Sequence, residues 1–227
     1  MDQVGTVIKN QMEELDKQER VLSHSQENTT TSSPSWSSEM IEKYLRHFGI
    51  SDDAIDASLQ IMDRAREMSE TMDKGNRGLL LHGPQGRGKT TTATAIMRFE
   101  IDRFLRNQSP YRSVQFVFVP DLMIELQGCF SPGSEKIPGD IIYRMSEYDF
   151  LVLDGIGEGG RQSDFAIGAM GTLIHHREAA RKTKRTIVTS NYSIAEIAER
   201  TDARIASRIA SMCDEVPFSG SDRRLQR

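Results

Sequence analysis

The sequence contains few cysteines and no apolar run long enough to cross a membrane. Its two cysteines, Cys129 and Cys213, form no C-x-x-C pair, so two separate thiols in a reducing compartment fit better than a disulfide. Spanning a bilayer takes about 20 apolar residues, and the N-terminus lacks the basic start and apolar block of a secretory signal. We therefore expect a cytoplasmic protein that has no membrane partner.

An excess of positive charge is also absent. The 29 lysines and arginines are outnumbered by 33 aspartates and glutamates, which gives a net charge of −4. This charge argues against a coat of phosphate-binding cations, so we expect any contact with nucleic acid to be local and helped by oligomerisation. With 227 residues, 37% hydrophobic and 27% charged, the composition is typical of a soluble protein with one domain and a short appendage.

The appendage is predicted at the N-terminus. Within residues 1–24, four apolar side chains fall on one helical face: Ile8, Met12, Leu15 and Leu22. Residues 25–38 are rich in serine and threonine and are predicted to be a linker. We expect a partner-binding amphipathic helix on a tether, although folding back onto the main domain at 39–227 is almost equally compatible with so short a pattern.

Helical and strand-like segments alternate within the main domain. A helical pattern runs from Met40 to about Met72 and breaks at FGISDD, where Gly49 can end one helix and Ser51 or Asp52 can cap the next. Continuous apolar runs then recur between helical stretches, at residues 78–83, 113–119, 150–154 and 186–191, with DEVPFSG near the end as a candidate fifth. This pattern predicts an α/β fold with a parallel sheet covered on both faces.

A phosphate-binding loop (P-loop) is predicted at the end of the first apolar run. GPQGRGKT fits the pattern G-x-x-x-x-G-K-[ST], follows a strand and opens a helix, as phosphate binding requires. Gly86 lets successive N–H groups face the phosphates, Lys89 would reach the β- and γ-phosphates, and Thr90 would hold Mg²⁺. The alternative is a glycine-rich turn with an incidental lysine. The predicted nucleotide contacts are Gly83, Pro84, Gln85, Gly86, Arg87, Gly88, Lys89, Thr90 and Thr91.

Two further polar residues close apolar strands. Asp154 ends FLVLD and, if its strand neighbours the first one, would lie beside the loop and hold the metal ion together with Thr90. Asn191 ends TIVTSN at the same edge, where an amide can hydrogen-bond the γ-phosphate and an attacking water. A helix cap for Asp154 and turn chemistry for Asn191 are the structural alternatives.

Five segments occur in a recognisable order along the chain: GPQGRGKT, FVFVPDLMIELQ, YDFLVLDGIG, IVTSNYS and RIASRIASM. Together they resemble the DnaC/DnaI-type bacterial helicase loaders, which have the IstB-type transposition helpers as relatives. The resemblance covers residues 39–227 and implies a three-layer AAA+ P-loop fold with a central parallel sheet and no helical lid. It further implies that ATP and Mg²⁺ are bound, and that the protein loads a replicative DnaB-type helicase onto single-stranded DNA. The alternative is an ATP-dependent, DNA-binding helper of a transposase.

The resemblance also assigns roles to single residues. Lys89 and Thr90 correspond to the Walker A pair, Asp154 to the Walker B aspartate, and Asn191 to the sensor-1 position.

Two arginines in RIASRIASM imply action between subunits. Arg208 falls where the family has its arginine finger, which reaches the γ-phosphate held by a neighbouring subunit. Arg204 lies one turn earlier on the same face and is a further candidate nucleotide contact. We therefore expect self-assembly through Arg208 in trans, with a solvated helix face as the alternative. A metabolic P-loop kinase, the third candidate function, is disfavoured because these arginines suggest contacts between subunits.

The resemblance breaks at Gly155, where many relatives have an acid that activates water. The nearest glutamate is Glu158, in a glycine-rich loop, and it is the candidate base. Since Asp154 can hold Mg²⁺ without residue 155, we predict ATP binding with slow hydrolysis. The predicted catalytic residues are thus Lys89, Asp154, Glu158, Asn191 and Arg208.

A basic stretch at residues 175–185 allows two interpretations. It could line a channel for single-stranded DNA, or it could place cations at the C-terminus of a helix, which is favourable by itself. The sequence favours the second.

Overall fold

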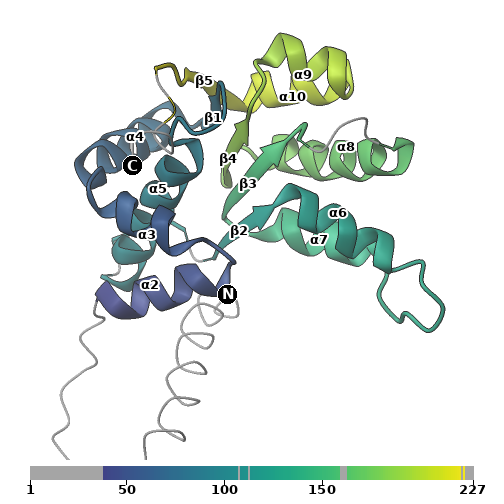
Figure 1. The fold of residues 1–227 in the computed structure, drawn as a ribbon, viewed down its shortest axis with the longest axis horizontal. Coiled ribbons are helices and arrows are strands. Elements are labelled where there is room, and N and C mark those ends of the chain that lie inside the picture. Colours follow the sequence, from purple (N-terminus) through teal and green to yellow (C-terminus); the bar gives the residue numbers. More distant parts are fainter. Residues whose placement is uncertain (1–37, 107, 112, 159–162, 221, 223–227) are drawn as a thin grey trace, which may run out of the picture.

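The structure of the protein is a computed structural model in which residues 38–106, 108–111, 113–158, 163–220 and 222 are described (Figure 1). The predicted helix at 1–24 and all but the last residue of the 25–38 linker lie outside the described residues. The predictions for the main domain can be compared with the structure directly.

The described strands form one parallel sheet. They are β1 (Gly78–His82), β2 (Val114–Phe118), β3 (Phe150–Ile156), β4 (Arg185–Ser190) and β5 (Cys213–Pro217). Their order in the sheet is β2-β3-β4-β1-β5, and each neighbouring pair is parallel. The predicted parallel sheet is confirmed, including the candidate fifth strand.

Helices precede β1 and connect the strands. Those before and just after β1 are α2 (Ser38–His47), α3 (Asp52–Leu59), α4 (Met62–Gly75) and α5 (Lys89–Leu105). The others are α6 (Val119–Gly128), α7 (Pro138–Glu147), α8 (Asp164–Ala179), α9 (Ile194–Arg200) and α10 (Ala203–Met212). None of the described helices is long and apolar enough to cross a membrane.

The helical stretch before β1 has one more break than predicted. Gly49, with φ of 75°, follows α2, and Ser51 is the N-cap residue of α3, both as expected. A second break separates α3 from α4, where Ile61 leaves the helical region with φ of −123° and ψ of 21°. No glycine or proline marks this position, so the local pattern could not predict the break.

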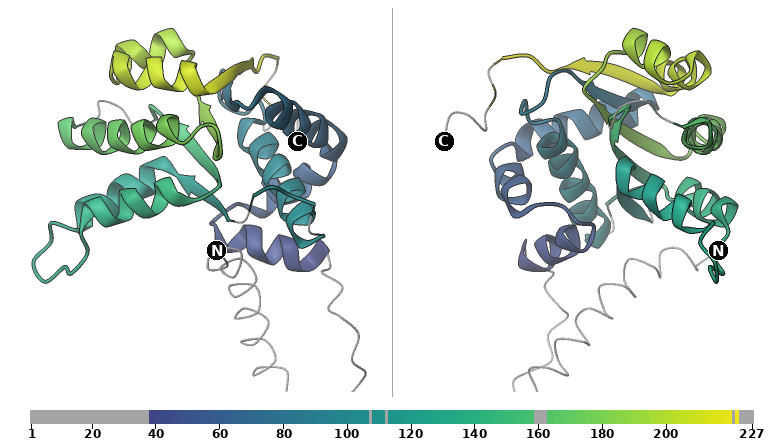
Figure 2. Two further views of the ribbon diagram at one scale, coloured as in Figure 1. Left: turned by 180° about the vertical axis from the view of Figure 1, so that it is seen from behind. Right: turned by 45° about the vertical axis from the view of Figure 1, so that its right-hand side comes forward.

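The sheet lies between two helical layers (Figure 2). Successive strand residues point to opposite faces, so Leu79 and Leu81 of β1 pack in a core with α2–α5, whereas Leu80 packs in a second core with α6–α10. Each fully buried leucine of this kind stabilises the fold by about 1.5–3 kcal/mol. The predicted three-layer arrangement is confirmed, and α5 and α10 lie on opposite faces of the sheet.

Arg177, in the basic stretch at the end of α8, is part of the interior. Its buried guanidinium donates to Oγ1 of Thr186 at 2.9 Å and to the carbonyl of Ser146 at 3.0 Å, and also to the carbonyls of Tyr148 and Arg185. Burial lowers the pKa of Arg177 to about 10, so the side chain stays charged at neutral pH. Arg177 therefore satisfies carbonyls at the ends of α7 and β4, and its side chain is not available to line a DNA channel.

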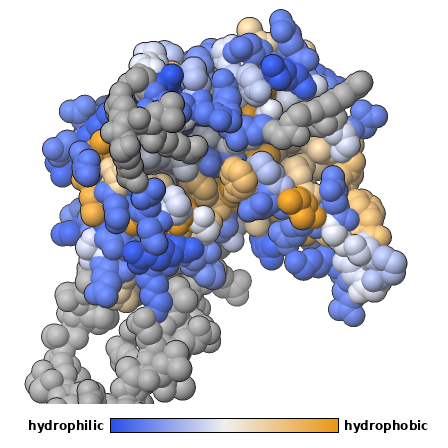
Figure 3. Space-filling model, viewed as in Figure 1, coloured by the Kyte–Doolittle hydropathy of each residue, from blue (hydrophilic) through white to orange (hydrophobic). Residues whose placement is uncertain are grey.

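Exposed apolar side chains gather on α6, α7 and the loop between them. The most exposed are Ile124, Phe130, Ile137 and Tyr143, and Phe130 stacks edge-on against Phe165 at the start of α8. Figure 3 shows apolar surface over this side of the molecule. Several exposed large apolar side chains in one region are typical of a contact site.

Candidate nucleotide-binding site

The P-loop lies between β1 and α5. Gly83, Gly86 and Gly88 have φ of 129°, 71° and 88°, a backbone that other residues rarely adopt, and the chain turns tightly at these glycines. The loop's successive N–H groups and the N-terminus of α5 form the kind of concavity that binds phosphate. Pro84 and Gln85 are exposed at the tip of the loop.

Lys89, the first residue of α5, is only 7% exposed. Its ammonium group donates to the carbonyls of Gly83 and Pro84, at 2.7 and 2.8 Å, and to Oδ1 of Asn191 at 2.8 Å. Since Asn191 directly follows β4, this contact connects the predicted sensor-1 position to the P-loop.

Asp154 lies next to the P-loop although its strand is not the neighbour of β1. The sequence placed Asp154 there on the condition that β3 and β1 are neighbours, but β4 lies between them. The side chains nevertheless bridge the gap, and Oγ1 of Thr90 donates to the Asp154 carboxylate, 3.0 Å from Oδ1 and 3.2 Å from Oδ2. Parallel strands end at one edge of the sheet, so residues from β3 and β4 and from the loop after β1 converge there.

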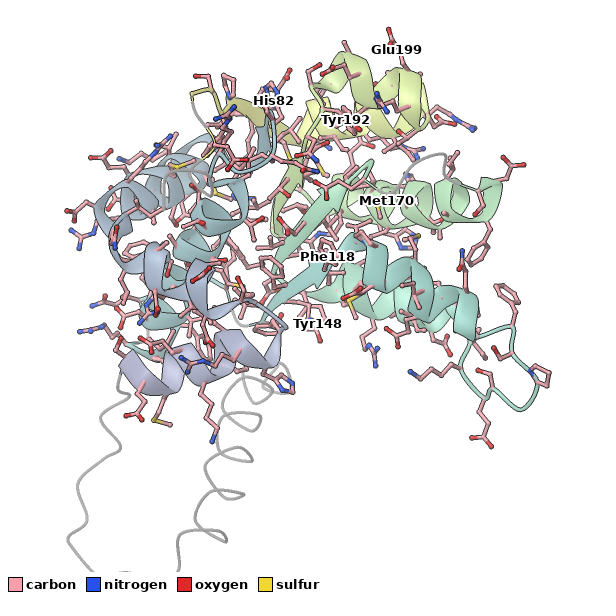
Figure 4. The ribbon with its side chains drawn as sticks, viewed as in Figure 1. His82, Phe118, Tyr148, Met170, Tyr192 and Glu199 are labelled. Atoms are coloured by element: carbon pink, nitrogen blue, oxygen red, sulfur yellow. The ribbon has the colours of Figure 1, made fainter. Side chains whose placement is uncertain are left out.

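Figure 4 marks this edge by three labelled side chains that lie at or just beyond the carboxyl ends of their strands. His82 is the last residue of β1, Phe118 is the last of β2, and Tyr192 follows β4. The guanidinium of Arg200 lies 4.1 Å from the centre of the Tyr192 ring. The loop after β4 is thus packed in place beside Asn191.

Asp154 is 7% exposed, and its pKa is raised because burial penalises the charged form. Hydrogen bonds from Thr189 and Thr90, and the positive charge of Lys89, act in the opposite direction without cancelling this effect. A buried carboxylate of this kind gains from a nearby cation.

The residues present fit Mg²⁺ brought by a nucleotide. Mg²⁺ prefers oxygen ligands and is usually held by one or two carboxylates together with substrate phosphates, and the hydroxyl of Thr90 and the carboxylate of Asp154 supply oxygens 3.0 Å apart. Within the described part of the chain, no group of three or more His, Cys, Asp or Glu side chains could hold a metal by itself. The donor set therefore suits a metal that arrives with phosphates.

Gly155 occupies an irregular position at the end of β3. Its φ is 87°, and the register between β3 and β4 shifts there. A β-carbon at this position would lie 3.3 Å from Oε2 of Glu158 and 3.3 Å from Cε2 of Phe118. The Glu158 carboxylate therefore lies against Gly155, and a turn closed by the Glu158 N–H and the Gly155 carbonyl, at 3.2 Å, brings it there.

Two residues near the site were not predicted. Oγ1 of Thr189 donates to Oδ1 of Asp154 at 2.6 Å, and a hydroxyl two positions before Asn191 was the available signal. Asp222 follows β5, and a β-carbon on Gly86 of the P-loop would collide with its carboxylate. No local pattern connects residues so far apart, so sequence reasoning could not find this contact.

The structure does not bring the two arginines of α10 to the site formed by Lys89 and Asp154, because α10 covers the face of the sheet opposite α5. Arg204 and Arg208 instead line a cavity of about 280 Å³ between α8 and α10. The Arg204 side chain is 83% exposed and pairs with Asp202 at 2.9 Å; Arg208 is 33% exposed and lies 3.5 Å from Glu178. Their placement on one helix face agrees with the predicted spacing, and their role stays a prediction.

Part of the chain is similar in sequence to a known protein. No protein-family model matches the chain. The chain is 28% identical over 102 residues to the replicative helicase loader DnaC of Buchnera aphidicola subsp. Schizaphis graminum (strain Sg), a match that covers 45% of this chain and 39% of that protein. The matched segment thus spans less than half of that relative's length.

Solved structures match over more of the chain. The crystal structure of DnaI has a TM-score of 0.52 at 23% identity, covering 75% of this chain and 87% of that one. The crystal structure of the DnaC helicase loader has a TM-score of 0.54 at 22% identity, covering 69% and 89%. AMPPCP-bound DnaA from Aquifex aeolicus has a TM-score of 0.55 at 15% identity, covering 69% and 45%. The chain therefore shares the α/β fold of these structures and resembles the DnaC/DnaI-type helicase loaders, with DnaA as a structural neighbour that is more distant in sequence.

Proposed function

We propose that the chain is an ATP-dependent loader of a replicative DNA helicase, in which ATP acts as an assembly switch and is hydrolysed slowly. The observation that supports this most strongly is the convergence of Lys89, Thr90, Asp154 and Asn191 at one edge of the sheet, through hydrogen bonds of 2.8–3.2 Å. These are the four positions that a P-loop ATPase needs for phosphate, metal and γ-phosphate sensing. The likeness to a DnaC over part of the chain supports the loader among P-loop proteins.

Each side chain has a distinct part in nucleotide binding. The P-loop N–H groups would hold the phosphates, and Lys89 would exchange its carbonyl partners for phosphate oxygens. Thr90 and Asp154 would hold Mg²⁺, which supplies positive charge opposite the phosphates. Asn191, now in contact with Lys89, would sense whether a γ-phosphate is present. Since these contacts join β4 to the P-loop, a change of nucleotide would move both.

The arrangement around Gly155 supports the proposed slow hydrolysis. A base must lie within hydrogen-bond reach of the water that it activates, and glycine has no side chain for this. Glu158 lies with its carboxylate against Gly155, close to where an acid at position 155 would begin. We propose that Glu158 is the base, at a less direct position, and that the γ-phosphate therefore persists long enough to act as a switch.

Partner contacts would come from other surfaces. The exposed apolar side chains of α6 and α7 suit a protein partner, and the arginines in the cavity between α8 and α10 suit the phosphates of a neighbouring copy. The N-terminal helix predicted at 1–24 is proposed to bind the helicase.

Affinity capture from the native cell tests the loader function. The full chain is used as bait with ATP, ADP or no nucleotide, with Lys89→Ala as the nucleotide-site variant and Lys74→Ala, an exposed lysine in the last turn of α4, as the matched control. We expect a replicative hexameric helicase to be recovered in an ATP-dependent way by the wild type and the control but not by Lys89→Ala. Recovery of a transposase without a helicase would instead support the IstB-like function and overturn the loader.

A further inference from the structure

Thr189 forms two hydrogen bonds at the centre of the site. Its side chain is buried on β4, and its hydroxyl donates to Oδ1 of Asp154 at 2.6 Å while it accepts from the N–H of Gly155 at 3.0 Å. A hydroxyl has one proton and can accept as well. Because the proton is directed at the carboxylate, the oxygen is left to accept from Gly155, and the two contacts orient one another.

The second contact falls at an irregularity of the sheet. Leu153 is paired with Val188 and Ile156 with Ser190, so two residues of β3 face the single residue Thr189 of β4. Such a bulge locally disrupts the ladder and bends the strand. The N–H of Gly155 is bonded by the Thr189 side chain at this point, so the hydroxyl closes the bulge.

The bulge has consequences on both sides of Gly155. Before it, the Asp154 carboxylate is directed toward Thr90 of the P-loop. After it, the left-handed Gly155 allows the turn that brings the Glu158 carboxylate back against the strand. The Thr189 hydroxyl thus bonds the bulge between Asp154, the proposed metal ligand, and the turn that leads to Glu158, the candidate base.

The neighbouring hydroxyls cannot replace Thr189. Thr90 also donates to Asp154, but its oxygen is itself a proposed metal ligand and would turn to Mg²⁺ in the loaded site. Ser190 points to the other face, where it donates to the carbonyl of Ile156 at 2.7 Å.

We propose that Thr189 is a positioning residue of the ATP site: it holds the Asp154 carboxylate in the orientation for Mg²⁺ and fixes the β3 bulge that places Glu158. The orientation of Asp154 for Mg²⁺ rests on the proposed ATP-binding function. The fixing of the β3 bulge concerns the nucleotide-free protein alone.

Three variants of full-length protein test the proposal. Thr189→Val keeps the shape and removes both hydrogen bonds, and Thr189→Ser keeps the hydroxyl. Thr186→Val is the matched control, because Thr186 lies on the same strand, is equally buried and bonds Arg177 away from the site. Two quantities are measured: the exchange rate of the Gly155 amide hydrogen without nucleotide, and the Mg²⁺ concentration that half-saturates binding of a fluorescent ATP analogue.

We expect Thr189→Val to speed Gly155 exchange by about threefold to tenfold, the size expected for losing a neutral hydrogen bond, and to raise the half-saturating Mg²⁺ concentration by about tenfold, the size expected for losing a hydrogen bond to a charged group. Thr189→Ser should stay within about twofold of the wild type in both. Thr186→Val should lower the melting temperature, because it removes the hydrogen bond to Arg177, but should leave the Mg²⁺ requirement unchanged. Analogue binding without Mg²⁺ should be alike in all four proteins.

Two results would overturn the positioning role: an unchanged Mg²⁺ requirement in Thr189→Val, or a Thr189→Ser protein that behaves like Thr189→Val. A wild type that shows slow Gly155 exchange but no binding of the analogue at any Mg²⁺ concentration would contradict the ATP function itself. The role of Thr189 in orienting Asp154 for Mg²⁺ would then be overturned as well. Its role in fixing the β3 bulge would still be decided by the Gly155 exchange rates of the variants.

Discussion

Gly155 is required by the backbone at the end of β3. With φ of 87°, a side chain at this position would cost about 1–2 kcal/mol in backbone strain, and its β-carbon would press on Glu158 and Phe118 at 3.3 Å. An acid at position 155 is therefore disfavoured by this bulge, and the carboxylate of Glu158 lies against the position instead. The left-handed backbone at Gly155 therefore explains both why no acid stands at position 155 and why the Glu158 carboxylate can pack there.

The role of Glu158 can be measured by turnover. We expect Glu158→Gln to lower kcat by about 100-fold, the lower limit for loss of a general base, with ATP affinity unchanged because the P-loop contacts remain. Glu199→Gln, on the exposed side of α9, is the control and should have no effect. Gly155→Glu should fail to speed hydrolysis because of its strained backbone. Brisk turnover that Glu158→Gln leaves unchanged would show that another group activates the water.

Asp154 should make the nucleotide-free protein less stable at neutral pH than a neutral residue at this position would. Its folded pKa is raised by burial, so the folded state disfavours the ionised form at neutral pH, and stability rises as the pH falls through the folded pKa toward the unfolded value. We expect Asp154→Asn to remove this pH dependence and to raise the melting temperature of the nucleotide-free protein at pH 7. The expected shift is about 2–4 °C, which corresponds to about 1 kcal/mol in a chain of this size.

The outcome of Asp154→Asn is read from thermal unfolding between pH 4 and 8 without Mg²⁺. The same variant should lose Mg²⁺-dependent nucleotide binding. A lower melting temperature at pH 7 would mean that the hydrogen bonds from Thr90 and Thr189 outweigh the burial of the charge.

Among single residues, the sequence predicted those that a short stretch of sequence identifies. Lys89 and Thr90 follow from one loop pattern, and Asp154 and Asn191 follow because each ends an apolar run. Thr189 and Asp222 were missed since their importance comes from a bulge in the ladder and from a contact between distant segments. Arg177 looked like a surface cation because charge alone does not reveal that a guanidinium is buried.

At the scale of elements, the position of β4 determines the site. It lies between β1 and β3, so Asn191 and Thr189 reach the P-loop side and the Asp154 side respectively. The sequence predicted parallel strands but not their order, because apolar runs that are buried on both faces do not specify their neighbours. The contact between Thr90 and Asp154 thus depends on the order of the strands, and on two side chains that are long enough to meet across the end of β4.

The segment after β5 should compete with nucleotide. The N–H of Phe218 continues the pairing of β5 with β1 by donating to the His82 carbonyl at 2.7 Å, and beyond it the carboxylate of Asp222 lies against Gly86. An anion there occupies part of the space where the loop would bind phosphate and repels it. We expect Asp222→Ala to tighten ATP binding by about tenfold, equivalent to about 1.4 kcal/mol, as measured by equilibrium titration.

A matched control for this effect is Asp214→Ala, an acid on β5 that pairs with Arg77 away from the loop. Unchanged ATP affinity in Asp222→Ala would show that the carboxylate moves aside at no cost.

At the scale of the whole molecule, the two arginines of α10 require a second copy in order to act on ATP. They line a cavity on the face of the sheet opposite α5. If Arg208 acts in trans, Arg208→Ala lowers turnover by about 1,000-fold, as expected for an arginine finger. Mixing it with Lys89→Ala should restore turnover above that of either protein alone, because one variant keeps the ATP site and the other keeps the arginine.

The mixing experiment has its own control. Arg181→Ala removes an exposed cation at the end of α8 and should leave turnover unchanged. No recovery in the mixture, with both variants folded and assembled, would assign Arg208 to its contact with Glu178; the same experiment with Arg204→Ala then tests the more exposed of the two arginines.

The central claim is that Lys89, Thr90, Asp154 and Asn191 form one Mg²⁺-dependent ATP site, and calorimetric titration of ATP tests it most directly. We predict that the wild type binds one ATP per chain, more tightly with Mg²⁺ than without. Lys89→Ala should abolish binding under both conditions, whereas Asp154→Asn should abolish only the gain from Mg²⁺. A wild type that binds no ATP, or an Asp154→Asn protein that keeps the full effect of Mg²⁺, would contradict the account.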